Sequence, residues 1–111
     1  MSANKPRVFI TQEGSHSYLE AERFGEVVFI TVEDLNNTRG SLHNEAVFRA
    51  IKGVLRDFNP EIDFIAPSGS PYVVAATFLV LGNMGFKNIK LLRYNNRDFN
   101  YIPMQIDLQR N

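Results

Sequence analysis

Two kinds of apolar pattern alternate along the chain: short unbroken runs, and longer runs with helical spacing. Residues 26–32 contain almost no polar position, which is typical of a central strand buried on both faces. Shorter runs at 8–11 and 62–66 predict two more strands. Over residues 41–58 apolar side chains recur every three or four positions, so this segment is predicted to be a helix with one buried stripe. Residues 17–25 predict a short helix of one to two turns.

Residues typical of helix starts and ends define the boundaries of the predicted helices more closely. Ser41 can cap the long helix and Pro60 ends it, because proline cannot continue a helix. Another helix is predicted to begin at Pro71, with Ser70 as its N-cap. This helix is predicted to end between Gly82 and Gly85, and Gly85 is the better candidate of the two for the left-handed residue that closes it.

The C-terminal part of the chain predicts a hairpin. A strand at 88–94 is followed by a turn rich in Asn and Asp at 95–100 and a last strand at 101–108. In the last strand every second residue is apolar, which predicts one wet face and one buried face, the latter formed by Ile102, Met104, Ile106 and Leu108. Pro103 cannot donate a ladder hydrogen bond and therefore predicts a position at the sheet edge.

Strands that alternate with helices predict a mostly parallel sheet covered on both faces. A chain of 111 residues is long enough for one core and too short for two. We therefore expect one α/β domain over residues 1–111. Its expected architecture is Rossmann-like and three-layered, with an antiparallel hairpin at the C-terminal edge of the sheet.

The loop Ser68-Gly69-Ser70 is the strongest indication of a binding site. In an α/β sheet, ligands bind beyond the carboxyl ends of the strands, near the point where the strand order reverses. There, this loop would offer backbone N–H groups, two hydroxyls and a positive helix end to an anionic ligand. The alternative is that Ser70 only caps its helix and Gly69 only makes the turn.

Polar residues after the other strands extend this candidate site. Arginines could clamp a phosphate or carboxylate, asparagines could give specificity, and a histidine in the first turn of a helix could hold a ligand or shuttle a proton. Each could equally be an ordinary solvated side chain, since strand ends are usually followed by polar loops. The candidates are Asn36, Asn37, Arg39, His43, Asn95 and Arg97.

Composition excludes several classes of function. The chain has no cysteine, which excludes a disulfide framework, a thiolate metal site and a catalytic thiol. Neither of its two histidines has metal-ligand spacing, and neither a P-loop nor a dinucleotide fingerprint occurs. Twelve basic and twelve acidic residues balance, so bulk nucleic-acid or membrane binding is not expected. Without an apolar signal segment the chain is expected to be cytoplasmic.

The helix from Pro71 is apolar almost all round, with Thr77 as its only polar interruption before Gly82. A helix on one face of an open sheet needs only an apolar stripe. We therefore expect its outer face to meet a second copy of the chain, with Tyr72, Val73 and Val80 as candidates for outward positions.

The turn Ser68-Gly69-Ser70-Pro71, the strand at 90–94 and the segment Asn100-Tyr101-Ile102-Pro103 resemble a family of small phage-borne proteins without an assigned activity. The strand that begins at Phe24 fits that family too. The resemblance implies fold and provenance, with the host cytoplasm as location. More distantly, the strand-loop-helix is similar to the ligand loop of CARF domains, dimeric sensors of cyclic oligonucleotides. The lysine typical of that loop is absent here, which puts nucleotide recognition in doubt.

Two functions follow as hypotheses. The first is a small binding module, a homodimer that holds an anionic or nucleotide-like ligand at the carboxyl edge of the sheet. The second is a non-catalytic structural or interaction protein whose apolar helix forms a homo-oligomer. An enzyme is the least favoured class, and no catalytic residue is assigned. A nucleotide hydrolase would use His43, and Ser68 as a nucleophile lacks both the G-x-S-x-G pattern and an identifiable base. The sequence assigns no metal site and leaves any cofactor unknown.

Overall fold

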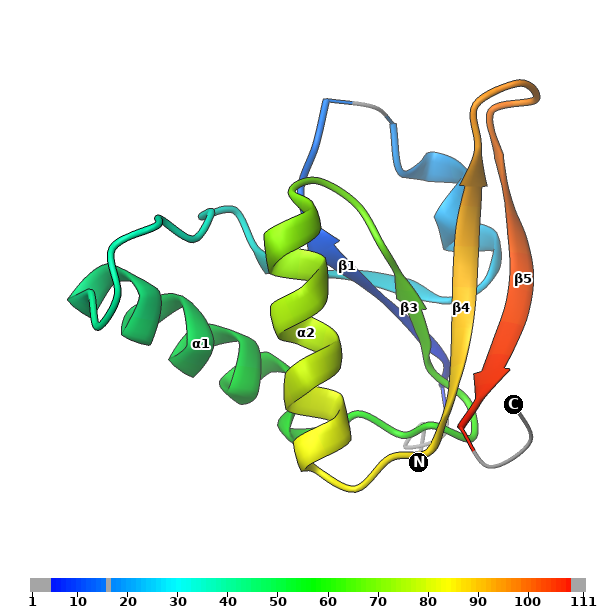
Figure 1. The fold of residues 1–111 in the computed structure, drawn as a ribbon. Helices are drawn as coiled ribbons and strands as arrows, with labels where there is room; N and C mark the ends of the chain where they lie inside the picture. The colour runs from blue at the N-terminus through cyan, green and yellow to red at the C-terminus, as the bar shows by residue number, and fades with distance from the viewer. Residues whose placement is uncertain (1–4, 16, 109–111) are drawn as a thin grey trace.

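The computed structural model describes residues 5–15 and 17–108 and contains one five-stranded sheet. The strands are β1 (Arg7–Gln12), β2 (Glu26–Thr31), β3 (Phe64–Ala66), β4 (Asn88–Asn95) and β5 (Asn100–Asp107). They lie in the order β2-β1-β3-β4-β5 (Figure 1). The first four are parallel, and β5 pairs antiparallel with β4. This confirms the predicted α/β fold with an antiparallel hairpin at its C-terminal edge.

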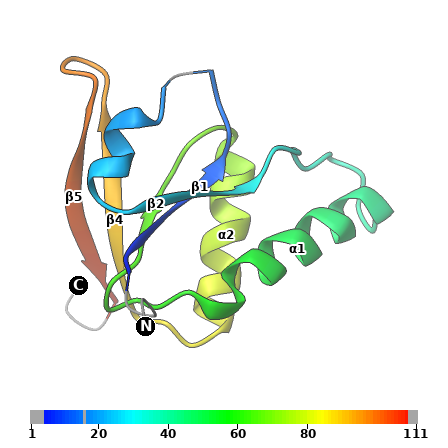
Figure 2. The same cartoon turned by 180° about the vertical axis from the view of Figure 1, so that it is seen from behind.

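Helices lie on both faces of the sheet. On one face are α1 (Leu42–Val54), which continues into the 3₁₀ turn η2 (Leu55–Asp57), and α2 (Pro71–Asn83). The 3₁₀ helix η1 (Leu19–Arg23) lies on the other face, as the front and back views show (Figures 1 and 2). The predicted helix over 41–58 is thus α-helical only to Val54, and its last turn is tighter.

A hydrophobic cluster fills each face. Under α1 and α2 it contains Phe9, Ile51, Leu55, Ile65 and Leu81 among others, all essentially inaccessible to solvent. The smaller cluster under η1 contains Val8, Ile10, Ala21, Ala66, Leu92 and Tyr101. Successive residues of β1 enter opposite clusters because side chains of a strand alternate between faces. Burial on both faces makes β1 the centre of the fold.

The predicted helix ends are confirmed by hydrogen bonds. The Ser41 hydroxyl accepts a bond from the Asn44 backbone N–H, and the Ser70 hydroxyl accepts one from the Tyr72 N–H. Both bonds satisfy N–H groups that have no partner inside the helix. At the other end of α2, Gly85 has a φ of 95°, the left-handed conformation expected after a helix.

The prediction that 26–32 is a central strand is wrong. This segment forms β2, which pairs only with β1 and lies at one edge of the sheet. Its residue Phe29 is correspondingly exposed, whereas Val8, Phe9 and Ile10 of β1 are fully buried. An unbroken apolar run fits a doubly buried strand, but strand order depends on the crossovers, which the run itself does not encode.

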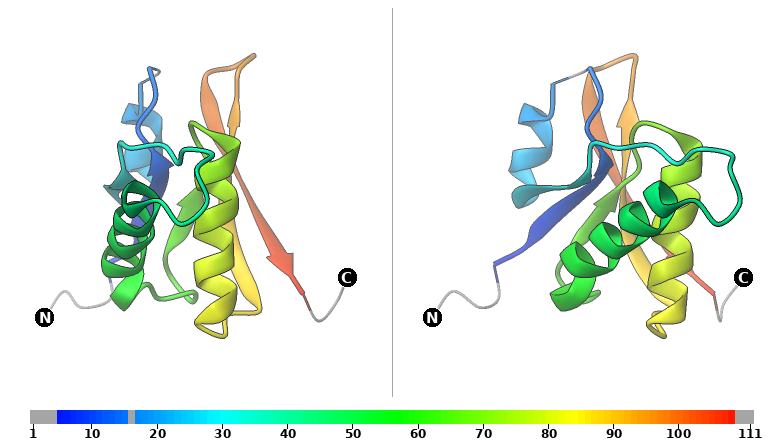
Figure 3. Two further views of the ribbon diagram at one scale, coloured as in Figure 1. Left: turned by 60° about the vertical axis from the view of Figure 1, so that its left-hand side comes forward. Right: turned by 90° about the vertical axis from the view of Figure 1, so that its left-hand side faces the viewer.

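The predicted burial of the last strand is also wrong. Tyr101 is the buried residue, while Ile102, Met104, Ile106 and Leu108 are 46%, 45%, 39% and 70% exposed. The apolar residues do alternate along β5, but they project from the face that holds α1 and α2, where they pair across from Arg93, Leu91 and Ile89. The left view of Figure 3 shows β5 lying beyond α2, on the side away from α1.

Two of the three predicted outward residues of α2 are buried. Val73 and Val80 belong to the core, whereas Tyr72 is exposed, as is Leu79. Because α2 has apolar residues around its whole circumference, the sequence could not tell which side faces the sheet. Its packing against α1 and β1 decides that question.

Candidate functional site

The loop between β3 and α2 lies at the topological switch point of the sheet. The chain adds β2 on one side of β1 and β3 on the other, so the strand order reverses between β1 and β3. This is the position where open α/β sheets usually bind ligands. In Figure 1 the loop stands at the upper end of α2, next to the end of β1.

Two N–H groups of this loop, those of Ser68 and Ser70, already have partners within the chain. The Thr11 hydroxyl accepts a hydrogen bond from Ser68 N at 2.8 Å and donates one to Ser68 O at 2.6 Å. The Gln12 side-chain oxygen accepts one from Ser70 N at 2.6 Å. Gln12 therefore occupies the place that an oxygen of a bound anion would take at Ser70 N.

Tyr18 joins the loop from the other face of the sheet. Its hydroxyl lies 3.0 Å from the Ser68 hydroxyl and accepts a hydrogen bond from the Gly14 backbone N–H. Nearby, burial raises the pKa of Tyr101 to about 12, and the neighbouring Tyr18 and Tyr94 phenols add to the rise. At neutral pH the Tyr101 phenol is therefore uncharged.

The predicted site residues do not include three residues of this arrangement: Thr11, Gln12 and Tyr18. Gln12 could be noticed as the polar residue that follows the predicted strand at 8–11, whereas the place of both Thr11 and Gln12 beside the loop depends on the pairing of β1 with β3. No motif marks Tyr18, whose place depends on the course of the segment before η1.

The Asn36, Asn37 and Arg39 segment lies elsewhere. It belongs to the connection between β2 and α1, which leaves the sheet and runs to the outer end of α1 (Figure 1). Asn36 is held there by Asn44, through two hydrogen bonds of 2.8 Å. His43 Nε2 lies 2.6 Å from the Asp34 carbonyl oxygen. These contacts order the start of α1, and Asn37 and Arg39 are exposed.

Asn95 and Arg97 occupy a third place, the tip of the β4–β5 hairpin. The Asn95 side chain accepts a hydrogen bond from Arg97 N at 3.0 Å and donates one to Asp98 Oδ2 at 3.2 Å. In Figure 1 the tip projects beyond the sheet, on the opposite side of the β3–α2 loop from the start of α1. The structure thus does not bring the three groups of candidate residues together.

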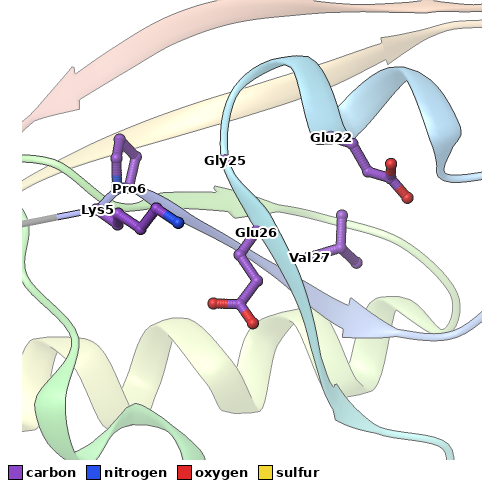
Figure 4. A pocket seen from close by; sticks show the side chains of 6 residues that line it. All are labelled: Lys5, Pro6, Glu22, Gly25, Glu26 and Val27. Atoms are coloured by element: carbon purple, nitrogen blue, oxygen red, sulfur yellow. The ribbon is translucent and has the colours of Figure 1, made fainter. Parts of the chain in front are cut away.

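A separate open pocket of about 660 Å³ lies at the amino end of the sheet. Lys5, Pro6, Gly25, Glu26 and Val27 line it together with Glu22 (Figure 4). The carboxylates of Glu22 and Glu26 point in different directions in this view. The pocket therefore offers no convergent set of groups to a ligand.

Residues 5–15 and 17–108 contain neither a metal-binding cluster nor a membrane-spanning helix. No three His, Cys, Asp or Glu side chains of this part of the chain gather closely enough to hold a metal ion. None of its helices is long and apolar enough to cross a bilayer.

An apolar surface lies between α2 and β5. We define the α2–β5 surface as Phe78 and Gly82 of α2 together with the side chains that project from β5 and the residue after it, Ile102, Met104, Ile106 and Leu108. At the end where α2 finishes and β4 begins, it contains a groove of about 320 Å³ lined by Phe78, Leu81, Gly82, Phe86, Ile106 and Leu108. Lys87, Ile89 and Asp107 complete the lining of the groove.

The fold and these surfaces define a small α/β protein with a Rossmann-like sheet, whose last strand, β5, exposes its apolar residues on one face. The chain belongs to the phage Pam3 gp32-like protein family, whose model matches residues 6–108. This confirms the predicted membership of a phage-borne family. No curated protein and no solved structure matches the chain, so the similarity to CARF domains stays a hypothesis.

Proposed function

We propose that this protein is a non-catalytic interaction protein that assembles with further copies of itself through the α2–β5 surface. The observation behind the proposal is the exposure of Ile102, Met104, Ile106 and Leu108 on a sheet face that α1 and α2 leave open. Sheets are normally covered on an apolar face, because burial of that face drives folding. A contiguous uncovered patch of this kind marks a contact with another molecule.

The energetics favour association. Burying apolar surface contributes about 25 cal/mol per Å², and a standard interface buries about 800 Å² on each partner. A gain of this size exceeds the entropic cost of association in many complexes. The balance of twelve basic and twelve acidic residues adds no long-range repulsion between copies.

Met104→Lys is expected to dissociate the assembly. Met104 lies in the middle of the exposed β5 row, and a buried lysine without a partner would cost far more than the methionine contributes. The molar mass in solution, measured by light scattering at micromolar concentrations, should fall to that of one chain. Leu42→Lys is the matched control: Leu42 is 81% exposed at the start of α1, and its replacement should leave the mass unchanged.

A wild-type chain that remains monomeric over the whole concentration range would contradict this proposal. So would a Leu42→Lys variant that dissociates while Met104→Lys does not.

A second candidate function is the binding of a small anionic or nucleotide-like ligand at the β3–α2 loop. It is supported by the position of Ser68, Gly69 and Ser70 at the switch point between β1 and β3. In this version the ligand displaces Gln12 Oε1 from Ser70 N. Arg39 and Arg97 would take no part unless their segments moved. A cytoplasmic location in the host is part of both proposals.

Gln12→Ala should therefore tighten ligand binding, because it frees Ser70 N from its internal partner. Sulfate, phosphate and a panel of nucleotides are expected to raise the melting temperature of this variant in proportion to ln(1 + [ligand]/Kd). The wild type should need higher ligand concentrations for the same rise. Equal and negligible shifts in both proteins at millimolar ligand would count against an anion site.

A further inference from the structure

The tip of the β4–β5 hairpin presents an aromatic residue in a conformation that aromatic residues avoid. Phe99 has a φ of 55° and is 70% exposed, although it makes up part of an ordered turn. A positive φ suits glycine or asparagine, and a bulky side chain there is an outlier. Asparagine is also a usual turn residue and would expose no apolar ring.

The turn holds Phe99 in this position. The two bonds of the Asn95 side chain, to Arg97 N and to Asp98 Oδ2, fix the residues that precede it. Its ring is therefore presented to solvent by a pre-organised loop and loses little freedom when it enters a partner. Aromatic residues of this kind are the usual anchors of protein interfaces.

We propose that Phe99 of one copy inserts into the groove of the next copy, between α2 and the end of β5. The groove has a volume of about 320 Å³ and its walls include Phe78, Phe86, Ile106 and Leu108. A dry apolar cavity of about 150 Å³ is large enough to bind benzene. The groove can therefore accept the ring and part of the backbone that presents it.

The charged residues of the hairpin tip and those of the groove can complement each other. Arg97 and Asp98 precede Phe99 at the tip, and Lys87 and Asp107 line the groove. An orientation that sets Arg97 against Asp107 and Asp98 against Lys87 would pair opposite charges. Such pairing contributes more to the orientation and selectivity of docking than to its affinity.

The tip cannot reach the groove of its own chain. The tip lies at one end of the β4–β5 ribbon, and residues 86–89 and 106–108, which include much of the groove lining, lie at the other end, as the course of the two strands in Figure 1 shows. A strand of eight residues such as β4 spans about 26 Å at roughly 3.3 Å per residue. The contact therefore joins the tip of one copy to the opposite end of another copy, head to tail. If the second copy returns the contact, a twofold dimer forms; if it does not, repetition gives rings or open chains. This inference rests on the proposed self-assembly and specifies how the α2–β5 surface is used.

Two variants test the contact from its two sides. Phe99→Asn removes the ring and suits the positive φ, so its melting temperature should equal or exceed that of the wild type while assembly is lost. Gly82→Arg fills the groove, and a side chain at Gly82 meets nothing within 4 Å in the fold. Light scattering should show each variant alone as a monomer.

Mixing the two variants gives the decisive result. The Gly82→Arg chain keeps its Phe99 tip and the Phe99→Asn chain keeps its groove, so an equimolar mixture should form a complex of two chains and grow no further. A mixture that remains monomeric, or a Phe99→Asn variant that assembles like the wild type, would overturn the head-to-tail contact. If the wild type assembles and only Met104→Lys dissociates it, the result would support self-assembly and contradict the contact between Phe99 and the groove. A monomeric wild type would overturn both.

Discussion

Replacing Asp63 by alanine is expected to lower the free energy of unfolding by about 3–5 kcal/mol, the usual loss when one partner of a buried ion pair is removed. Asp63 is completely buried. Its Oδ1 accepts a hydrogen bond from Arg7 N at 3.0 Å, and its Oδ2 accepts bonds from Asn59 N at 2.8 Å and from the Arg7 guanidinium at 3.3 Å. One carboxylate thus joins the start of β1 to the segment between η2 and β3.

The size of the loss comes from what alanine leaves behind. Two backbone N–H groups, of Arg7 and Asn59, would lose their acceptor at a partly buried site, where each unsatisfied group costs roughly 1–3 kcal/mol. The Arg7 guanidinium would keep its bond to the Asp57 carbonyl oxygen, at 2.8 Å, but lose its buried counter-charge.

Asp57→Ala is the matched control, to be measured beside Asp63→Ala by urea unfolding. Asp57 also pairs with Arg7, at 3.6 Å, but its side chain is 78% exposed. An exposed pair contributes about 0–1 kcal/mol, so this variant should unfold almost like the wild type. Asp63→Asn keeps an acceptor oxygen and should lie between the two. Equal small losses for Asp57→Ala and Asp63→Ala would show that the Asp63 network does not stabilise the fold.

Local patterns in the sequence predicted the elements and their ends well. Ser41, Ser70 and Gly85 act over a few residues, through one hydrogen bond or one backbone conformation, and all three are found as predicted. The alternation of strands and helices then restricts the topology to a mostly parallel sheet, because parallel strands require crossover helices. The α/β fold follows from these two facts.

Burial was harder to predict than secondary structure. The alternation of Ile102, Met104 and Ile106 correctly indicates one apolar face, but an apolar face is buried only if another element covers it. The helices of that face pack against β1 and β2, and no helix follows β4, because the chain returns directly as β5. The sequence pattern therefore indicates the apolar face of β5, but it does not indicate whether another element covers that face.

The candidate site shows the same difference between local and long-range information. The position of Ser68, Gly69 and Ser70 at the switch point followed from the strand-loop-helix pattern alone. The partners of that loop, Thr11 and Gln12, lie more than fifty residues earlier in the chain, and only the pairing of β1 with β3 brings them there. No pattern in one sequence indicates such contacts.

Gly69→Val is the second change expected to have a large effect, with a loss of about 2–6 kcal/mol in the free energy of unfolding. Gly69 has a φ of 80°, and holding a β-branched residue there costs roughly 1–3 kcal/mol. A Cβ at this position would also lie 2.2 Å from Gln12 Oε1 and 2.7 Å from Gln12 Cβ. Relieving such overlaps forces shifts that typically cost about 1–3 kcal/mol more.

Gly40→Val separates these two contributions. Gly40 has a similar φ of 72°, but a Cβ there would meet nothing within 4 Å. Its valine variant should therefore show the backbone strain alone, and the loss for Gly69→Val should be larger by the cost of displacing Gln12. The displacement also breaks the bond from Ser70 N to Gln12 Oε1, which loosens the start of α2. Equal losses for the two variants in urea unfolding would mean that Gln12 yields freely, and that the loop is open enough to exchange this side chain for a ligand.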